Sequence, residues 1–257
     1  MYKVLRSLFD AALHRRSLRR WQRLADGADA LSADALRQNR LRGRQLRRHI
    51  DRLTHLAEGR LALPLIGSNV IQCPPASDWA HRPGIWAGPL PEPGRSAVPN
   101  KAQIGSEATV FHDCKVSELT IRQIRNSRES DLAPFGLRLD VFRFDGSFLS
   151  LAIDLPTEAA QSLRLKHIVR VNTVVDMEKP LEIFARLNIK HGPNLEQIVR
   201  EIPLQGPEVA VEFDLAYSKV NEKRIEKMWL DLIFEGPEMN QIILRDVTIS
   251  RHPRAEL

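Results

Sequence analysis

Residues 181–190 read LEIFARLNIK and alternate between aliphatic and other side chains. Successive side chains of an extended strand point to opposite faces. One face would therefore be entirely aliphatic, with Leu181, Ile183, Ala185, Leu187 and Ile189. The opposite face would carry Glu182, Phe184, Arg186, Asn188 and Lys190. This pattern predicts a strand with one face in a core and the other toward solvent, which is typical of antiparallel sheets.

The same period of two continues on both sides of this stretch. Pro, Gly, Asn and Asp clusters separate ten strand-like runs, at 107–113, 117–124, 137–144, 148–154, 166–176, 181–190, 195–202, 209–216, 227–235 and 241–251. Only one helical turn, at 157–163, interrupts them. Because no helix of ordinary length lies between the strands, we expect an antiparallel β-sandwich of jelly-roll type over residues 101–257, not a parallel α/β sheet.

The first 60 residues have a different character. They contain 15 Lys and Arg against six Asp and Glu, a net charge of +9, whereas the whole chain carries +6 and the remaining 197 residues therefore sum to −3. Residues 3–25 have helical spacing of apolar side chains, and Ser32 is a suitable N-cap for a second helix. We expect a basic amphipathic helical hairpin over residues 1–60.

Between these parts lies a proline-rich segment, residues 61–100. Seven prolines and three glycines fall within residues 73–100 and disfavour both helix and central strand. The segment is thus a linker or an irregular strap. Trp79 and Trp86 favour a strap, because a free linker would leave both rings exposed.

The faces of the predicted strands suggest a binding surface. If the strands at 181–190 and 227–235 share a sheet, their non-core faces bring together Phe184, Arg186, Asn188, Trp229 and Asp231. Asp214 or Asp246 could join them, although the alternation places Asp246 on the face of Ile242 and Leu244. An aromatic platform flanked by carboxylate, amide and guanidinium groups suits a sugar, which offers a C–H face and pairs of hydroxyl groups. The alternative is a solvated sheet face with cross-strand ion pairs.

The arginine-rich helices allow three interpretations. They could be a solvated helical pair that packs on the sandwich or on a second copy, which would make a homo-oligomer. They could bind an anionic membrane surface or an acidic protein partner. Nucleic acid is the less favoured partner, because no nucleic-acid fold signature accompanies the charge. The residues assigned to an anionic surface are Arg15, Arg16, Arg19, Arg20, Arg23, Arg44, Arg47 and Arg48.

Several classes of function lose their usual support. The chain has no GxSxG, HExxH, GxGxxG or phosphate-loop pattern. His112, Asp113 and Cys114 are consecutive, so strand geometry cannot converge them on one metal ion. We expect no metal, no cofactor and no enzymatic activity, although a glycosidase pair such as Glu212 and Asp231 stays open.

The sequence also bears on location. Two cysteines, Cys73 and Cys114, give no disulfide framework. Arg6 and Asp10 interrupt the apolar start of the chain, and no small-residue cleavage site follows, so we do not expect a secretory signal. These features together predict a cytoplasmic protein.

Several segments of the chain are similar to those of a known family. They are FHDC at 111–114, APFGLRLDVFRFDGSFLSLAIDLP at 133–156, FARLNIKHGPN at 184–194, FDLAY at 213–217 and WLDLIFEGPEMNQIILRDVTISR at 229–251. The chain resembles, over residues 79–257, an uncharacterised bacterial family of a domain of unknown function, which implies no activity. Its last strands are also similar in style to those of jelly-roll carbohydrate-binding modules, an analogy of fold.

The sequence thus predicts a non-catalytic binding module. Its β-sandwich would bind a glycan or glycoconjugate, and its basic helices would act as an adaptor. Two alternatives stay open: a structural or assembly protein that uses the sandwich as a protein-interaction platform, and a peripheral membrane protein that binds through the helices.

Overall fold

The computed structural model describes residues 2–61, 70–204, 206 and 208–254, and within the two long helices it describes the side chains of residues 12–47, 49–51, 53 and 54. The chain divides into two compact units, residues 1–54 and 55–257. The first unit holds helix α1 (Tyr2–Asp26), a short 3-10 turn η1 (Ala28–Ala30) and most of helix α2 (Ala33–Leu61). The two predicted N-terminal helices are therefore confirmed. Ser32 precedes α2, and its Oγ accepts a hydrogen bond from the backbone N–H of Ala35 at 3.4 Å.

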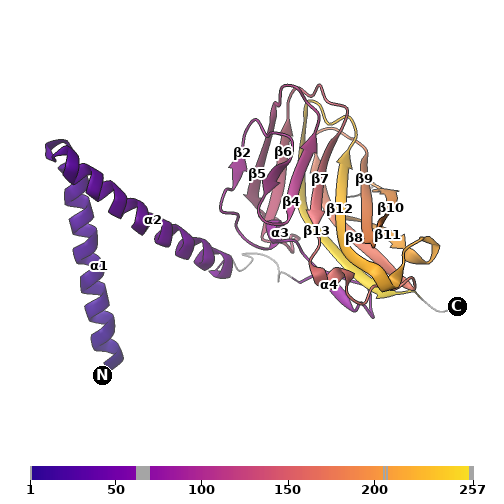
Figure 1. Ribbon diagram of the computed structural model, residues 1–257, viewed down its shortest axis with the longest axis horizontal. Coiled ribbons are helices and arrows are strands. Elements are labelled where there is room, and N and C mark those ends of the chain that lie inside the picture. The colour runs from indigo at the N-terminus through magenta and orange to yellow at the C-terminus, as the bar shows by residue number, and fades with distance from the viewer. Residues whose placement is uncertain (1, 62–69, 205, 207, 255–257) are drawn as a thin grey trace. The chain divides into compact units, whose positions relative to one another are not determined.

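The second unit is a sandwich of two antiparallel sheets (Figure 1). Its strands are β1 (Trp79–His81), β2 (Gly94–Arg95), β3 (Ala102–Ile104), β4 (Ala108–His112), β5 (Leu119–Arg125), β6 (Phe135–Val141), β7 (Leu149–Asp154), β8 (His167–Met177), β9 (Ile183–His191), β10 (Asn194–Glu201), β11 (Glu208–Asp214), β12 (Ile225–Phe234) and β13 (Asn240–Pro253). Short helices α3 (Gly84–Ala87) and α4 (Thr157–Ala160) and the 3-10 turns η2 (Leu215–Tyr217) and η3 (Glu222–Arg224) complete the unit. The predicted mainly β class is confirmed.

The order of the strands gives the sandwich its jelly-roll character. The seven-stranded sheet runs β11-β8-β13-β6-β5-β2, with β1 paired to β13, and the six-stranded sheet runs β10-β9-β12-β7-β4-β3. The chain passes repeatedly from one sheet to the other, and the last two strands, β12 and β13, lie inside the two sheets. Strands distant in sequence are thereby brought side by side.

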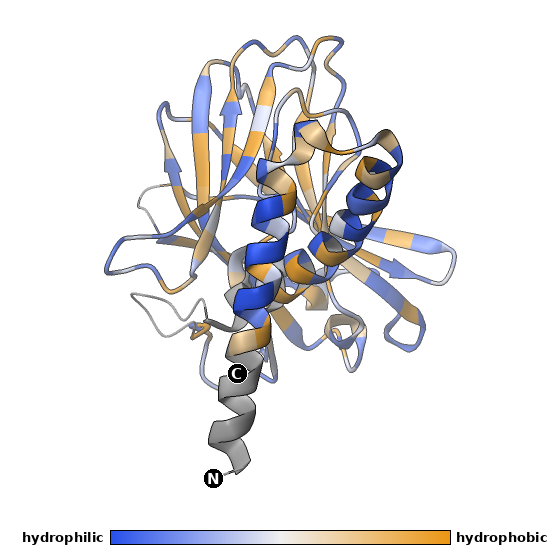
Figure 2. Ribbon diagram, turned by 90° about the vertical axis from the view of Figure 1, so that its left-hand side faces the viewer, coloured by the Kyte–Doolittle hydropathy of each residue, from blue (hydrophilic) through white to orange (hydrophobic). Residues whose placement is uncertain are grey.

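One apolar core fills the space between the sheets. Alternate residues of β9 are buried as the period predicts: Ile183, Ala185, Leu187 and Ile189 are all 0% exposed. Hydrophobic and hydrophilic positions alternate along the strands in Figure 2. The expected division of β9 into a core face and an outer face is therefore confirmed.

A β-bulge in β13 overturns one predicted face. The pairing of β13 with β8 shifts between Leu244 and Asp246, so that Arg245 is an extra residue. An extra residue reverses the faces of all later residues in the strand. Val247 and Ile249 are the core residues after the bulge, at 0% exposed. The prediction that Asp246 shares the face of Ile242 and Leu244 is wrong for this reason.

The proline-rich strap is built into the sandwich from Trp79 onward. Its strands β1 and β2 join the seven-stranded sheet, and between them Trp86 is completely buried. The indole Nε1 of Trp86 donates a hydrogen bond to the carbonyl of Leu244 at 2.8 Å. Arg82 donates two hydrogen bonds to Asp246, at 2.8 and 2.7 Å. These contacts fasten the strap at the bulge of β13.

Candidate functional site

The predicted ligand-binding residues lie on neighbouring strands. Strand β12 pairs with β9 so that Trp229 is opposite Asn188, Asp231 is opposite Arg186, and Ile233 is opposite Phe184. All five predicted residues are on the outer face of the six-stranded sheet, because the residues between them fill the core. The strand order therefore brings the predicted cluster together.

Asp231 is the centre of a hydrogen-bonded network. The residue is only 4% exposed, and its Oδ2 accepts hydrogen bonds from Arg186 Nε at 2.9 Å and from Asn188 Nδ2 at 2.9 Å. Arg186 Nη2 lies 2.8 Å from the same oxygen. Asn188 Oδ1 in turn accepts a hydrogen bond from Gln197 Nε2 at 2.7 Å. The network holds the carboxylate and the guanidinium in one geometry.

Asn188 and Phe184 occupy places that differ from the expected ligand contact. Asn188 is 0% exposed, and both its Nδ2 and its Oδ1 form hydrogen bonds within the network. It can position Asp231, but it cannot touch a ligand on the surface. Phe184 is half-buried opposite Ile233 and does not line the hollow that opens on this face.

A hollow of about 740 Å³ opens on this outer face. Small side chains line its middle: Thr109 on β4, and Ser150 and Ala152 on β7, the strand that pairs with both β4 and β12. Larger side chains surround them: Phe111, Phe148, Asp154, Arg186, Lys190, Lys227, Trp229, Asp231 and Ile233. The hollow thus combines aromatic and aliphatic side chains with charged ones, among them Asp231 and Arg186 of the network.

The cations of the hollow are all paired with carboxylates. Besides Arg186 with Asp231, Lys227 Nζ lies 2.8 Å from Asp154 Oδ1, and Lys190 Nζ lies 2.8 Å from a carboxylate oxygen of Glu226. Lys227 Nζ also lies 5.8 Å from the centroid of the Trp229 ring. The surface is consequently polar without a strong excess of either charge.

Sequence reasoning missed part of the hollow. Phe111, Phe148 and Lys227 were not predicted, although Thr109 and Phe111 fall on the non-core positions of the run at 107–113. The alternation therefore already places Thr109 and Phe111 on an outer face. It does not reveal which sheet they belong to, because the sequence of these strands does not show that β4 and β7 continue the sheet of β9 and β12.

The predicted carboxylate pair is separated by the core. Glu212 is on the outer face of β11 in the seven-stranded sheet, whereas Asp231 is on the outer face of the six-stranded sheet. Asp214 and Asp246 also belong to the seven-stranded sheet. These residues cannot act together with Asp231. Within residues 2–61, 70–204, 206 and 208–254, no group of three His, Cys, Asp or Glu side chains could hold a metal ion.

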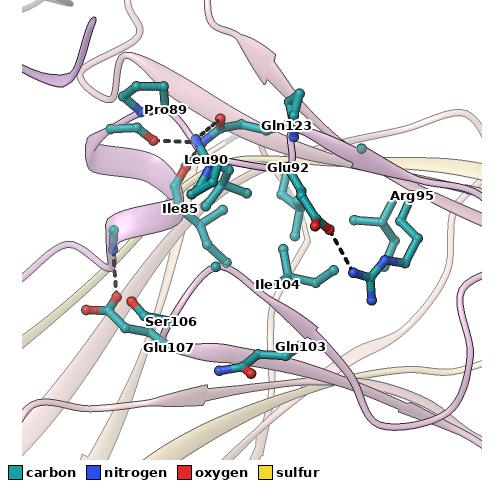
Figure 3. A pocket seen from close by; sticks show the side chains of 18 of the residues that line it. Ile85, Pro89, Leu90, Glu92, Arg95, Gln103, Ile104, Ser106, Glu107 and Gln123 are labelled. Carbon is teal, nitrogen blue, oxygen red and sulfur yellow. Dashed lines mark hydrogen bonds and ion pairs between the residues drawn. The ribbon is translucent and has the colours of Figure 1, made fainter. Parts of the chain in front are cut away.

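A second cavity, of about 780 Å³, lies under the strap (Figure 3). Gln123 reaches into it and bonds the strap at three points: its Nε2 donates to the carbonyls of Ile85 and Gly88 at 2.6 and 2.8 Å, and its Oε1 accepts from Leu90 N at 2.8 Å. Glu107 accepts a hydrogen bond from Gly84 N at 2.7 Å. The central polar groups of this cavity are therefore used to hold the strap in place.

The basic helices present charge and apolar side chains together. The described arginines among those assigned to an anionic surface are all exposed, while the side chain of Arg48 lies outside the described part. Leucine and isoleucine side chains are also exposed, at Leu13, Leu18, Leu36, Leu41, Leu46, Ile50 and Leu53. Among the described helices, none is both long and apolar enough to cross a membrane.

Two antiparallel sheets around one core, with a partly aromatic hollow on one outer face, define a jelly-roll β-sandwich protein with an added pair of basic helices. The chain belongs to DUF6478, a family of unknown function whose model matches residues 1–257. The expected resemblance to an uncharacterised family is confirmed, and the match includes the helices. No curated protein matches the chain in sequence.

Several solved structures resemble the sandwich. One is the family 11 carbohydrate-binding module from Clostridium thermocellum with a β-1,3-1,4-mixed-linked tetrasaccharide, at 9% identity and TM-score 0.39, covering 62% of this chain and 96% of that one. The xylan-binding domain from Paenibacillus barcinonensis Xyn10C has 9% identity and TM-score 0.36, covering 63% and 94%. The enzymatically active domain of bacteriophage CBA120 tailspike protein 4 has 8% identity and TM-score 0.40, covering 56% and 19%. Likeness at this level carries no ligand over to this chain.

Proposed function

We propose that the β-sandwich is a non-catalytic binding module for an uncharged glycan, which occupies the hollow on the six-stranded sheet. The observation that supports it is the half-buried Trp229 beside the fixed pair of Asp231 and Arg186, in a hollow that small side chains also line. An aromatic ring next to fixed polar groups is a combination that suits the C–H face and the hydroxyl groups of a glycan.

The chemistry of the hollow fits a sugar in three respects. An aromatic ring stacks on the C–H face of a pyranose, while a fixed carboxylate and guanidinium can each engage neighbouring hydroxyl groups. The volume of about 740 Å³ lies in the usual range of small-ligand sites, roughly 300–1,000 Å³. Because the cations already have carboxylate partners, an uncharged ligand is favoured over an acidic one.

Binding fits this site better than catalysis. Asp231 and Asp154 are the only carboxylates that line the hollow within the described residues, and each is engaged by a cation. Asp231 in addition accepts a hydrogen bond from the buried Asn188. Such fixed acceptors orient hydroxyl groups, and nothing in the described lining of the hollow supplies a nucleophile with an adjacent base.

The test is calorimetry of the full chain with cello-, xylo- and galacto-oligosaccharides, followed by Trp229→Ala. A sugar that covers about 80 Å² of the ring would contribute about 2 kcal/mol, so the substitution should weaken binding about 30-fold. Phe142→Ala is the matched control, because Phe142 is 54% exposed and follows β6 in the other sheet. Equal affinity of wild type and Trp229→Ala, or no binding to any of these sugars, would remove the proposal.

A second candidate function belongs to the helices, which we propose as an adaptor to an anionic surface in the cytoplasm. The supporting observation is that arginines and apolar side chains are exposed side by side on both helices. Arginine near an anionic bilayer contributes about 1 kcal/mol per residue, while the leucines can enter the interface. Self-association of the helices, as in an assembly protein, is the competing explanation for the same exposed side chains.

Vesicle flotation separates these alternatives. The full chain should bind vesicles with anionic lipid, release at high salt, and ignore purely zwitterionic vesicles. Replacing Arg15, Arg16, Arg19, Arg20 and Arg23 with Gln should abolish this binding. Vesicle binding that is independent of lipid charge would contradict an anionic surface.

A further inference from the structure

Strand β10 is an open edge of the six-stranded sheet. It is eight residues long, Asn194–Glu201, it pairs with β9 in a regular register, and no other described strand pairs with it. It contains neither Pro nor Gly, and Leu195 and Val199 are each 47% exposed. Natural proteins usually interrupt or cover such an edge, because its free N–H and C=O groups recruit another strand.

The register of the hairpin decides which backbone groups of β10 point away from β9. The loop between β9 and β10 has two residues, Gly192 and Pro193, and it is closed by the pair His191 and Asn194. In such a hairpin the closing pair is hydrogen-bonded, and hydrogen-bonded pairs then alternate with non-bonded ones. The residues whose N–H and C=O point away from β9 are therefore Leu195, Gln197, Val199 and Glu201.

We propose that β10 pairs with β10 of a second copy of this chain, antiparallel, with the twofold axis at Ile198. This register places Gln197 opposite Val199 of the partner subunit and Leu195 opposite Glu201 of the partner subunit. Each of these four residues has outward-pointing backbone groups, so both strands can satisfy their hydrogen bonds. Shifting either strand by one residue would set outward groups against groups already bonded to β9.

Charge complementarity supports the same register. Glu196 is opposite Arg200 of the partner subunit, and the symmetry makes this ion pair twice. These are non-hydrogen-bonded positions, where side chains approach most closely, and opposite charges there stabilise the pairing. Arg200 is exposed, and its Nη1 donates a hydrogen bond to the outward carbonyl of Val199 at 3.0 Å, which pairing with a second copy would replace. Glu196 is partly exposed, and its Oε1 accepts a hydrogen bond from Lys219 N at 3.0 Å.

The dimer joins the two six-stranded sheets edge to edge. Gln197 and Val199 are on the outer face, like Asn188 and Arg186 beside them. Direct opposition of outer-face residues keeps the outer faces of the two copies on the same side. The two hollows then face one way, an arrangement that allows both to bind one long or surface-bound ligand.

The test is sedimentation velocity of the full chain over a wide concentration range. Seven paired residues make an interface only about 23 Å long, so the expected dimer is weak and should form between about 1 and 300 μM. Glu196→Arg alone and Arg200→Glu alone each set like charges opposite one another, and each variant should be monomeric. An equimolar mixture restores both ion pairs and should dimerise. Glu129→Arg, an exposed charge reversal outside β10, should behave as wild type.

A cysteine pair tests the register separately. In a Cys73→Ser/Cys114→Ser background, Ile198→Cys should form a disulfide-linked dimer under mild oxidation, because the two copies of residue 198 are opposite one another. Gln197→Cys should not. A wild type that stays monomeric, a dimer unaffected by both charge reversals, or a mixture no more dimeric than its parts would overturn the proposal.

Discussion

Breaking the ion pair between Arg82 and Asp246 should destabilise the sandwich strongly. The guanidinium and the carboxylate share two hydrogen bonds, and their side chains are only 3% and 12% exposed. Arg82 comes from the strap between β1 and α3, and Asp246 directly follows the bulge of β13. The pair therefore joins two segments that are distant in sequence.

The size of the effect follows from burial. Asp246→Asn removes the negative charge that accepts two hydrogen bonds from the buried Arg82 guanidinium, and breaking a buried ion pair typically costs about 3–5 kcal/mol. Arg82 Nη2 keeps a hydrogen bond to the carbonyl of Val70 at 3.1 Å, so we expect the lower end, about 3 kcal/mol. In a unit of roughly 200 residues this lowers Tm by about 6–12 °C. Replacing both partners, Arg82→Met with Asp246→Leu, should recover most of the loss, since no charge is left buried.

Urea and thermal unfolding of the variants measure these differences. Glu92→Gln is the control, because Glu92 pairs with Arg95 at 2.8 Å but is 77% exposed, and its loss should change the free energy of unfolding by less than about 0.5 kcal/mol. The reasoning fails if Asp246→Asn costs no more than this control. It also fails if the double variant is less stable than Asp246→Asn.

Three further predictions concern stability and the support of the site. Burial lowers the pKa of His81, so the unfolded chain binds this proton more tightly than the folded one. The free energy of unfolding should then fall as pH drops through about 6.5, and His81→Phe should flatten that part of a urea-based pH profile. Burial raises the pKa of Asp176, but hydrogen bonds from Arg245 and Arg128 outweigh this effect, so the pKa is lowered overall. The ionised Asp176 therefore stabilises the folded state above about pH 4, and this contribution to the free energy of unfolding should disappear on further acidification. Asp176→Asn should remove the same pH dependence. Asn188→Ala removes a hydrogen-bond donor to Asp231 without changing a residue that lines the hollow, so sugar affinity should fall several-fold. Gln123→Ala, which removes a hydrogen bond to the strap, should reduce thermal stability but not sugar affinity.

The alternation in the sequence was sufficient to predict β4 to β13 and most of their faces, but it did not predict the short strands β1, β2 and β3. Residues of β9 such as Ile183 and Leu187 were assigned to the core from spacing alone, because a period of two is a local property of an extended backbone. Asp246 was assigned to the wrong face because the same local period was continued through the bulge of β13. One extra residue at Arg245 shifts the pairing, and a bulge of this kind leaves no mark in the apolar pattern.

The candidate site was predicted in part. Trp229, Asp231 and Arg186 were named from their outer faces, which is local information, and the structure places them together. Phe111 and Phe148 were missed because they join the hollow only through the order of the strands. Asn188 was expected at the surface, yet the neighbouring Gln197 bonds its amide and it is fully buried.

The sequence by itself determined that the helices are basic, that the strands alternate, and which side chains face outward in strands without a bulge, because these properties depend on neighbours along the chain. The tertiary structure decided which strands are adjacent, that the strap is fastened to β13, and that β10 is left as an open edge. Those outcomes depend on long-range pairing and on the closing of one shared core. Neither is encoded in the spacing of residues within any single strand.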